Sequence, residues 1–336
     1  MSLASKEWVA SLPKAELHLH IDGSLEAELM MQLAKKNAVA LPYKSVDDVK
    51  AAYDFPDLQG FLDLYYLGAS ALKTEDDFYQ LMIAYLRKCK EQNIVHCEIM
   101  IEPQTYLPAG IGFDVFMPGF KKAIAEADEG WGQSVALILS LLKHETEDHC
   151  IEVLKMADAY RQDFVALGMA STEIGNPPEK FERLYKIAKE KGYELTTHAG
   201  EEGPAEIVEQ SLAKLGVTRI DHGVRSSDDP DLLKDLKDKQ IPLTVCPVSN
   251  VKLNVFDSME KHNIVDLLEQ GIMVTVNSDD PAYFGAYINE NFYALLDAFS
   301  LTKAQVVQLL KNAFSASYLP DTTKEKYFSE LDAQLA

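Results

Sequence analysis

Two histidines near the start of the chain have a spacing that suits metal binding. His18 and His20 lie in the stretch 15–21, where polar and apolar residues alternate as in a β-strand. Side chains two residues apart point to the same face of a strand, so both imidazoles project together while the apolar residues face the other side. Two neutral imidazoles that converge on one point form half of a zinc site. Taken alone, the pattern equally fits polar residues on a half-exposed strand.

Three later apolar stretches also end in residues that can bind a metal or transfer a proton. These residues are, in chain order, His198, Glu201, His222, Asp279 and Asp280. A third histidine and one carboxylate would complete a site with the first pair and leave a coordination position for water, as in catalytic zinc sites. Zinc lowers the pKa of such a water to about 7, which makes hydroxide available at neutral pH.

The acidic residues in this set are expected to have different roles. Glu201 lies three residues beyond His198 with two small residues between them, so it can reach over a metal as a general acid or base. The alternative is a carboxylate that favours the N-terminus of the following helix, but the glycines around Glu201 indicate close backbone approach. Asp279 and Asp280 are adjacent and cannot both point at one atom. One is expected to bind the metal, while the other contacts substrate or starts a helix.

An alternation of strand and helix patterns must position these residues. Apolar runs predict eight strands, at 15–21, 94–100, 134–142, 164–169, 193–198, 219–222, 241–246 and 272–277. Helical patterns lie between them, at 25–37, 115–129, 145–160, 181–191, 205–215, 232–239 and 265–270, with a longer helical insertion at 46–92 and a helical tail at 291–336.

This alternation predicts an α/β fold, a TIM (β/α)8 barrel with extra helices after strand 1 and at the C-terminus. We expect a single domain over residues 1–336. The runner-up is an open doubly wound sheet, but GxGxxG is missing after the first strand. Barrel enzymes hold their catalytic groups at the carboxyl ends of the strands, where the histidines and carboxylates described above fall.

Two further expectations follow from the position of residues in this barrel. The insertion at 46–92, with breaks near Pro56 and at 73–74, either covers a site at the tip of the first strand or packs in the outer layer. Four histidines do not end strands as neatly and are interpreted as surface or packing residues: His96, His144, His149 and His262.

Composition restricts the classes of function. The formal net charge of −21 argues against a nucleic-acid or anionic membrane surface, which needs clustered Lys and Arg. Four scattered cysteines without a CxxC pair fit a reducing cytosol better than a disulfide framework. We identify neither a signal peptide nor an apolar run of about 20 residues. The expected protein is cytoplasmic.

Taken together, the motifs resemble the adenosine/adenine deaminase family of the amidohydrolase superfamily. The motifs are His18-x-His20, His198-Ala-Gly-Glu201, Asp221-His222-Gly223 and Ser278-Asp279-Asp280-Pro281, and the resemblance extends over residues 12–287. It implies a TIM barrel enzyme with one Zn²⁺ per chain, held by His18, His20, His198 and Asp279.

The resemblance also implies roles for the other residues in the deamination of a small-molecule purine. Glu201 protonates ring nitrogen N1 while zinc-bound hydroxide attacks C6, and ammonia then leaves. His222 orients or deprotonates the attacking water, and Asp280 contacts N7. Other zinc deaminases use His/Cys/Cys ligands with a PCxxC signature, which this chain lacks.

Within the family, the stretches 171–178, 219–223 and 279–285 are more similar to the adenine deaminase branch. Tyr283 and Phe284 have the bulk to close a pocket where ribose would lie, or they merely pack under the last helix. Asp22 favours the other branch, because in adenosine deaminases an Asp at that place contacts the ribose.

The expected reaction is therefore deamination of adenine to hypoxanthine and ammonia, with adenosine or an N6-substituted adenine as alternative substrates. A hydrolase with two bridged metals would need a Lys or Glu bridge, and strand four does not end in Lys. A non-catalytic purine-binding barrel would predict the loss of a ligand or of Glu201, and all of them are present.

Overall fold

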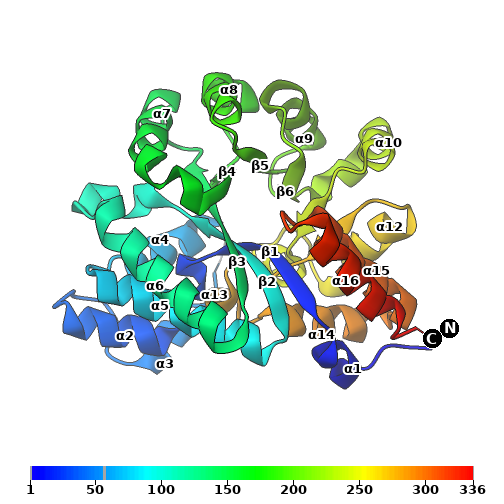
Figure 1. Ribbon diagram of the computed structural model, residues 1–336, viewed down its shortest axis with the longest axis horizontal. Coiled ribbons are helices and arrows are strands. Elements are labelled where there is room, and N and C mark those ends of the chain that lie inside the picture. Colours follow the sequence, from blue (N-terminus) through cyan, green and yellow to red (C-terminus); the bar gives the residue numbers. More distant parts are fainter. Residues whose placement is uncertain (1, 56–57, 336) are drawn as a thin grey trace.

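Eight parallel strands form a barrel surrounded by helices in the computed structural model, which describes residues 2–55 and 58–335 (Figure 1). The strands are β1 (Lys14–His20), β2 (Ile94–Ile101), β3 (Ser134–Leu142), β4 (Phe164–Ala170), β5 (Glu194–Ala199), β6 (Arg219–His222), β7 (Leu243–Val245) and β8 (Val274–Val276). Each strand pairs in parallel with the next one in the chain. The predicted TIM barrel is confirmed.

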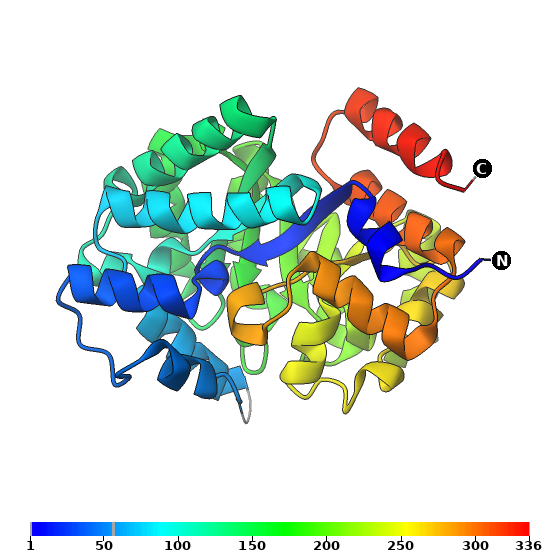
Figure 2. The same cartoon turned by 90° about the horizontal axis from the view of Figure 1, so that it is seen from below.

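The helices surround the strands in chain order. After α1 (Lys6–Ser11) and β1, four helices precede β2, namely α2 (Ala27–Lys36), α3 (Val46–Ala51), α4 (Leu58–Ala69) and α5 (Glu75–Glu91). The next five follow β2 to β6 in turn, namely α6 (Phe113–Trp131), α7 (Glu147–Met156), α8 (Glu182–Glu190), α9 (Ala205–Gln210) and α10 (Pro230–Lys239). The remaining helices are α11 (Pro247–Lys252), α12 (Ile264–Glu269), α13 (Pro281–Phe284), α14 (Ile288–Phe299), α15 (Lys303–Ala316) and α16 (Asp321–Asp332). Figure 2 shows α16, in red, at the periphery beside α15.

The element boundaries follow local chemistry. The predicted break at 73–74 is confirmed, because the Thr74 side chain accepts a hydrogen bond from the Asp77 amide and caps the start of α5. The break expected near Pro56 lies outside the described residues. The predicted helix at 25–37 begins only at Ala27, since residues 22–24 form a short 3₁₀ turn directly after β1.

The strands are buried along nearly their whole length, as expected for a parallel sheet with side chains inside and helices outside. The barrel closes between β1 and β8 at its carboxyl end. There the amide of His20 donates to the Asp279 carbonyl at 3.0 Å, and the Asp279 amide donates to the His18 carbonyl at 3.1 Å. The seam between the first and last strands therefore lies at the predicted site.

Two further observations concern the molecule as a whole. In residues 2–55 and 58–335, every helix is too short or too polar to cross a membrane. All four cysteines are buried as free thiols.

Candidate metal and catalytic centre

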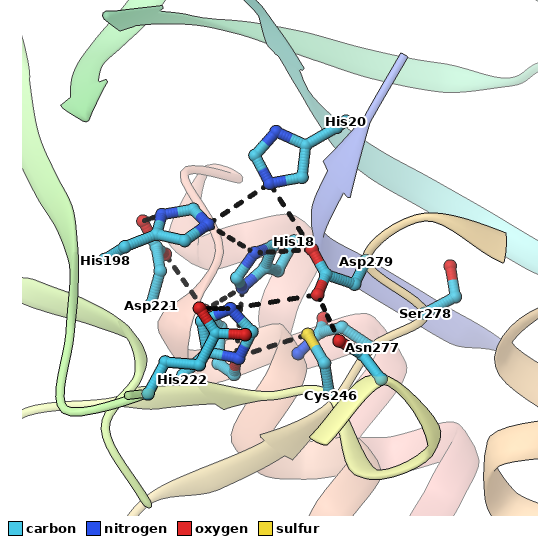
Figure 3. Close-up of polar contacts among 12 residues, drawn as sticks. His18, His20, His198, Asp221, His222, Cys246, Asn277, Ser278 and Asp279 are labelled. Carbon is cyan, nitrogen blue, oxygen red and sulfur yellow. Dashed lines mark hydrogen bonds and ion pairs between the residues drawn. The ribbon is translucent and has the colours of Figure 1, made fainter. Parts of the chain in front are cut away.

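The four predicted metal ligands meet at the carboxyl end of the barrel (Figure 3). His18 and His20 lie at the end of β1, His198 lies at the end of β5, and Asp279 follows β8. Nε2 of His198 is 3.1 Å from Nε2 of His18 and 3.2 Å from Nε2 of His20. Both of the latter nitrogens are 3.3 Å from Oδ1 of Asp279.

These separations fit a zinc ion. Zinc–ligand bonds of about 2.0–2.1 Å in a tetrahedron give ligand–ligand edges of about 3.3–3.4 Å. Burial lowers the pKa of His198 to about 4, so its imidazole is neutral, as ligation requires. Neutral imidazole nitrogens and a carboxylate oxygen that face one another are all acceptors, and a cation at their centre would satisfy them.

Another grouping of possible ligands shares part of this set. It combines His18 and Asp279 with His222 and Cys246. Burial raises the pKa of the Cys246 thiol well above its usual range, which disfavours the thiolate that binds zinc. The donor chemistry therefore favours the three histidines with Asp279.

A second group of residues contacts the imidazole nitrogens that point away from the proposed metal position. Nδ1 of His20 is 2.7 Å from Oε1 of Glu102, a buried residue directly after β2. Nδ1 of His18 lies 3.1 Å from the Thr244 carbonyl oxygen. A proton donated from Nδ1 to these oxygens leaves Nε2 free for a metal. Sequence reasoning missed Glu102, although it is a polar residue at the end of a strand.

The carboxylate ligand has a hydrogen-bond partner, whereas the third imidazole faces a carboxylate at a longer distance. The Ser249 hydroxyl donates to Oδ2 of Asp279 at 2.6 Å. Nδ1 of His198 faces Oδ2 of Asp221 at 3.6 Å, and the Thr196 hydroxyl donates to the same oxygen at 2.9 Å. Asp221, the neighbour of His222 in the sequence, therefore lies behind His198 as a buried carboxylate held by the Thr196 hydroxyl.

The turn that carries Glu201 is held by another carboxylate. Glu173 accepts backbone N–H bonds from Gly200 at 2.8 Å and from Glu201 at 2.9 Å. Gly200 has a φ of +70°, which glycine adopts without strain. Burial, followed by repulsion from Asp279, raises the pKa of Glu201 well above its usual range. This shift favours the protonated carboxylic acid of Glu201 over its carboxylate.

His222 and Asp280 complete the set at the same end of the barrel. Nε2 of His222 is 3.5 Å from Oε2 of Glu201 and 3.8 Å from Oδ2 of Asp279. Asp280 is buried, and its Oδ1 has no partner among the described residues. A Cβ at Gly23 would collide with the Asp280 carboxylate, so glycine is required there.

Two of these side chains are directed by an unusual backbone. His222 and Asp279 both have positive φ, +62° and +65°, in the left-handed region that favours glycine. Such conformations cost roughly 1–3 kcal/mol each and occur mainly at functional sites. The strain is consistent with side chains that the fold must aim at one point.

A pocket opens above these groups. Its base is formed by the predicted ligands and acids, except for the deeper His18. Its cover comes from α4, through Phe61, Leu62, Tyr65 and Tyr66. Of the two alternatives for the insertion, α4 therefore follows the first, because its side chains line the pocket above the site.

Tyr283 and Phe284 act on the pocket indirectly. Neither residue is among the described residues that line the pocket. Both pack against α4: the ring centroids of Phe61 and Phe284 are 4.9 Å apart, and those of Tyr65 and Tyr283 are 5.9 Å apart. The two aromatic residues after β8 therefore support the cover.

Asp22 is held by a hydrogen bond within the protein. It is completely buried, and its Oδ1 accepts a 2.7 Å hydrogen bond from the Tyr106 hydroxyl. It is not among the described residues that line the pocket. The other carboxylate oxygen of Asp22, Oδ2, has no hydrogen-bond partner among the described residues.

The four remaining histidines are not among the described residues that line the pocket. His144 and His149 are partly exposed, whereas His96 and His262 are buried.

A barrel that gathers three histidines and an aspartate at its strand ends has the architecture of an amidohydrolase. A model of the adenosine deaminase family matches residues 13–334, and the chain belongs to this family. The family resemblance found in the sequence is thus confirmed.

Individual relatives of the chain are named as adenine deaminases or as an amidohydrolase. The chain is 51% identical to an adenine deaminase from Hahella chejuensis, over 98% of this chain and 99% of that protein. The crystal structure of adenine deaminase from Arthrobacter aurescens superposes with a TM-score of 0.94 at 40% identity, over 97% of this chain and 99% of the other. An amidohydrolase structure from Burkholderia ambifaria with bound Zn shares the fold, with a TM-score of 0.90 at 24% identity, over 99% of this chain and 94% of that one.

Proposed function

We propose that the chain catalyses the zinc-dependent hydrolytic deamination of adenine to hypoxanthine and ammonia. The observation that carries the proposal is the convergence, at one covered pocket, of a four-ligand cage with a protonated carboxylic acid beside it. The relatives from Hahella and Arthrobacter are both named adenine deaminase and match nearly the whole chain.

One Zn²⁺ per chain is proposed on His18, His20, His198 and Asp279, since their mutual distances suit a tetrahedral ion. When bound, zinc supplies a nucleophile at neutral pH by lowering the pKa of a water molecule to about 7. The remaining chemistry belongs to the protein's own side chains.

Three side chains would act on the purine and the water. Glu201 donates its proton to ring nitrogen N1, which makes C6 more electrophilic. Asp280 donates to N7, because burial raises the pKa of its carboxyl well above the usual range and keeps it protonated. His222 contacts the oxygen that attacks C6, from a position beside Glu201. The C6–N bond then breaks and ammonia leaves.

The preference for a free base is supported by two features of the pocket. The aromatic cover from α4 lies over the site, and Asp22 is completely buried with one of its oxygens bound by Tyr106. A ribose would find less room beneath this cover.

We also propose a cellular location and a domain organisation for the enzyme. The four buried free thiols fit a reducing cytoplasm. Because β1 and β8 belong to one barrel, residues 1–336 are proposed to form a single domain whose partner is a small-molecule purine.

Steady-state assays of the zinc-loaded enzyme on adenine and adenosine, side by side, test this function. We expect kcat/KM for adenine to exceed that for adenosine by about 100-fold, the scale of discrimination that pocket shape can provide. Equal or greater kcat/KM on adenosine would overturn the assignment of adenine.

A further inference from the structure

A chain of buried hydrogen bonds runs from His222 away from the metal cage. Nδ1 of His222 lies 3.2 Å from Nδ2 of Asn250, on α11. Oδ1 of Asn250 lies 3.2 Å from Nε2 of His262, which packs against the Phe256 ring at a centroid distance of 4.3 Å. Nδ1 of His262 lies 3.1 Å from the backbone nitrogen of Ile264, at the start of α12.

The direction of each of these bonds follows from Ile264. A backbone N–H can only donate, so Nδ1 of His262 accepts and carries no proton. A neutral imidazole with an unprotonated Nδ1 has its proton on Nε2. Burial lowers the pKa of His262 to about 3, which keeps this ring neutral.

The same logic passes through Asn250 to His222. Nε2 of His262 donates to the Asn250 oxygen, which fixes the orientation of the amide. The amide therefore presents its NH2 group to His222, and Nδ1 of His222 must accept. Neutral His222 then carries its proton on Nε2, the nitrogen that faces Glu201.

We propose that Asn250 and His262 are positioning residues that hold His222 as the Nε2–H tautomer. This proposal rests on the proposed deaminase function. In this tautomer His222 donates a hydrogen bond to the attacking oxygen and orients it, and it does not act as the base. The water's proton goes instead to the Glu201 carboxylate, which the transfer of its own proton to N1 has just freed.

The first test is Asn250→Asp, which replaces a donor by an acceptor of the same shape. Nδ1 of His222 would then have to carry the proton, and Nε2 would become an acceptor. We expect kcat on adenine to fall by about 100-fold or more, as when a catalytic histidine is held in the wrong tautomer, while KM and zinc content stay close to wild type. In ¹⁵N NMR spectra of histidine-labelled, zinc-loaded enzyme, Nδ1 of His222 should change from an unprotonated to a protonated nitrogen.

A second pair of variants acts from the far end of the chain of bonds. His262→Gln keeps an N–H donor for Asn250 and should retain most of kcat. His262→Leu leaves the amide free to turn and should lower kcat about 10-fold, as expected for loss of an orienting partner. His96→Leu is the matched control, since His96 is equally buried on β2 and should affect stability without changing kcat of the folded enzyme.

Wild-type kcat and unchanged His222 nitrogen shifts in both Asn250→Asp and His262→Leu would overturn the proposal. A wild-type enzyme that does not turn over adenine would instead contradict the proposed function, and the NMR spectra would still determine the tautomer.

Discussion

His18 and His20 each direct Nε2 toward the proposed zinc and Nδ1 toward an oxygen of the protein. For His20 the protein partner is the buried carboxylate of Glu102, at 2.7 Å. A carboxylate in this position fixes the tautomer and increases the basicity of the ligating nitrogen. We therefore expect the zinc affinity to depend on residues that do not touch the metal.

Glu102→Gln tests this dependence. The variant keeps an acceptor oxygen but loses the negative charge, so zinc affinity should weaken about 10- to 100-fold. Competition with a chromophoric chelator measures the change. The matched control is Glu145→Gln, which alters another carboxylate–histidine pair, with His149, at the partly exposed start of α7. Unchanged affinity in Glu102→Gln would contradict the orienting role.

Glu201→Gln tests the proton donor itself. The amide cannot give a proton to N1, so turnover of adenine should fall by about 10²–10⁴-fold while zinc content is intact. Metal analysis of the same preparation is required, because lost zinc would mean that Glu201 is a ligand. Glu202→Gln is the neighbouring control, since Glu202 accepts hydrogen bonds from Thr172 and the Glu173 amide outside the cage and should leave turnover near wild type.

The sequence was sufficient to predict which residues the barrel brings together as candidate ligands, but not their supporting residues. His20 is the last residue of β1 and His198 the last but one of β5, and position near a strand end is a local property of the sequence. Glu102 and Asn250 act through neighbours that only the folded barrel provides. Asp22 shows the same limit, because the Tyr106 hydroxyl that engages it lies far along the chain.

At the scale of elements, α4 decides what the pocket admits. Leu62→Ala would remove bulk from the cover without disturbing the more deeply buried Phe61 and Tyr65. We expect kcat/KM for adenosine to rise about 10-fold relative to that for adenine, the scale expected for a change of a few methylenes in an apolar pocket. Assays on both substrates measure the ratio, and Asp63→Ala, on the exposed side of α4, is the control. A ratio equal to that of the control would contradict a selective role for the cover.

The order of strands and helices was predictable because strands and helices have different patterns of apolar residues in the sequence. The residues at which each strand begins and ends were less predictable. The apolar runs at 241–246 and 272–277 contain strands of only three residues each, Leu243–Val245 and Val274–Val276. The side chains of residues that follow these strands point to the candidate site or to the contact between β1 and β8. For example, the Asn277 side-chain oxygen accepts a hydrogen bond from the Leu17 amide at 2.9 Å. Hydrophobicity alone does not show where strand pairing ends.

At the scale of the whole molecule, the proposed zinc joins distant strands. Its ligands come from β1, β5 and the end of β8, so a bound ion would stabilise the folded barrel relative to the unfolded chain. Removing zinc with a chelator should lower Tm, and the free energy involved is about 4 kcal/mol if free zinc exceeds Kd by 1,000-fold.

Differential scanning calorimetry with and without zinc measures this effect. Glu201→Gln should keep the full zinc-dependent rise in Tm, because it leaves the cage intact. His20→Ala should lose it. A rise in Tm of the same size in His20→Ala would mean that the stabilising zinc binds elsewhere.

The seam between β1 and β8 also has a consequence for biosynthesis. Because a chain is made from its N-terminus, His18 and His20 leave the ribosome early, and one edge of β1 must wait until Asp279 has been synthesised. An unpaired strand edge is a template for association with other chains. The nascent protein is therefore most vulnerable to aggregation before its last strand arrives, and the ion can enter a complete site only after that strand has closed the barrel.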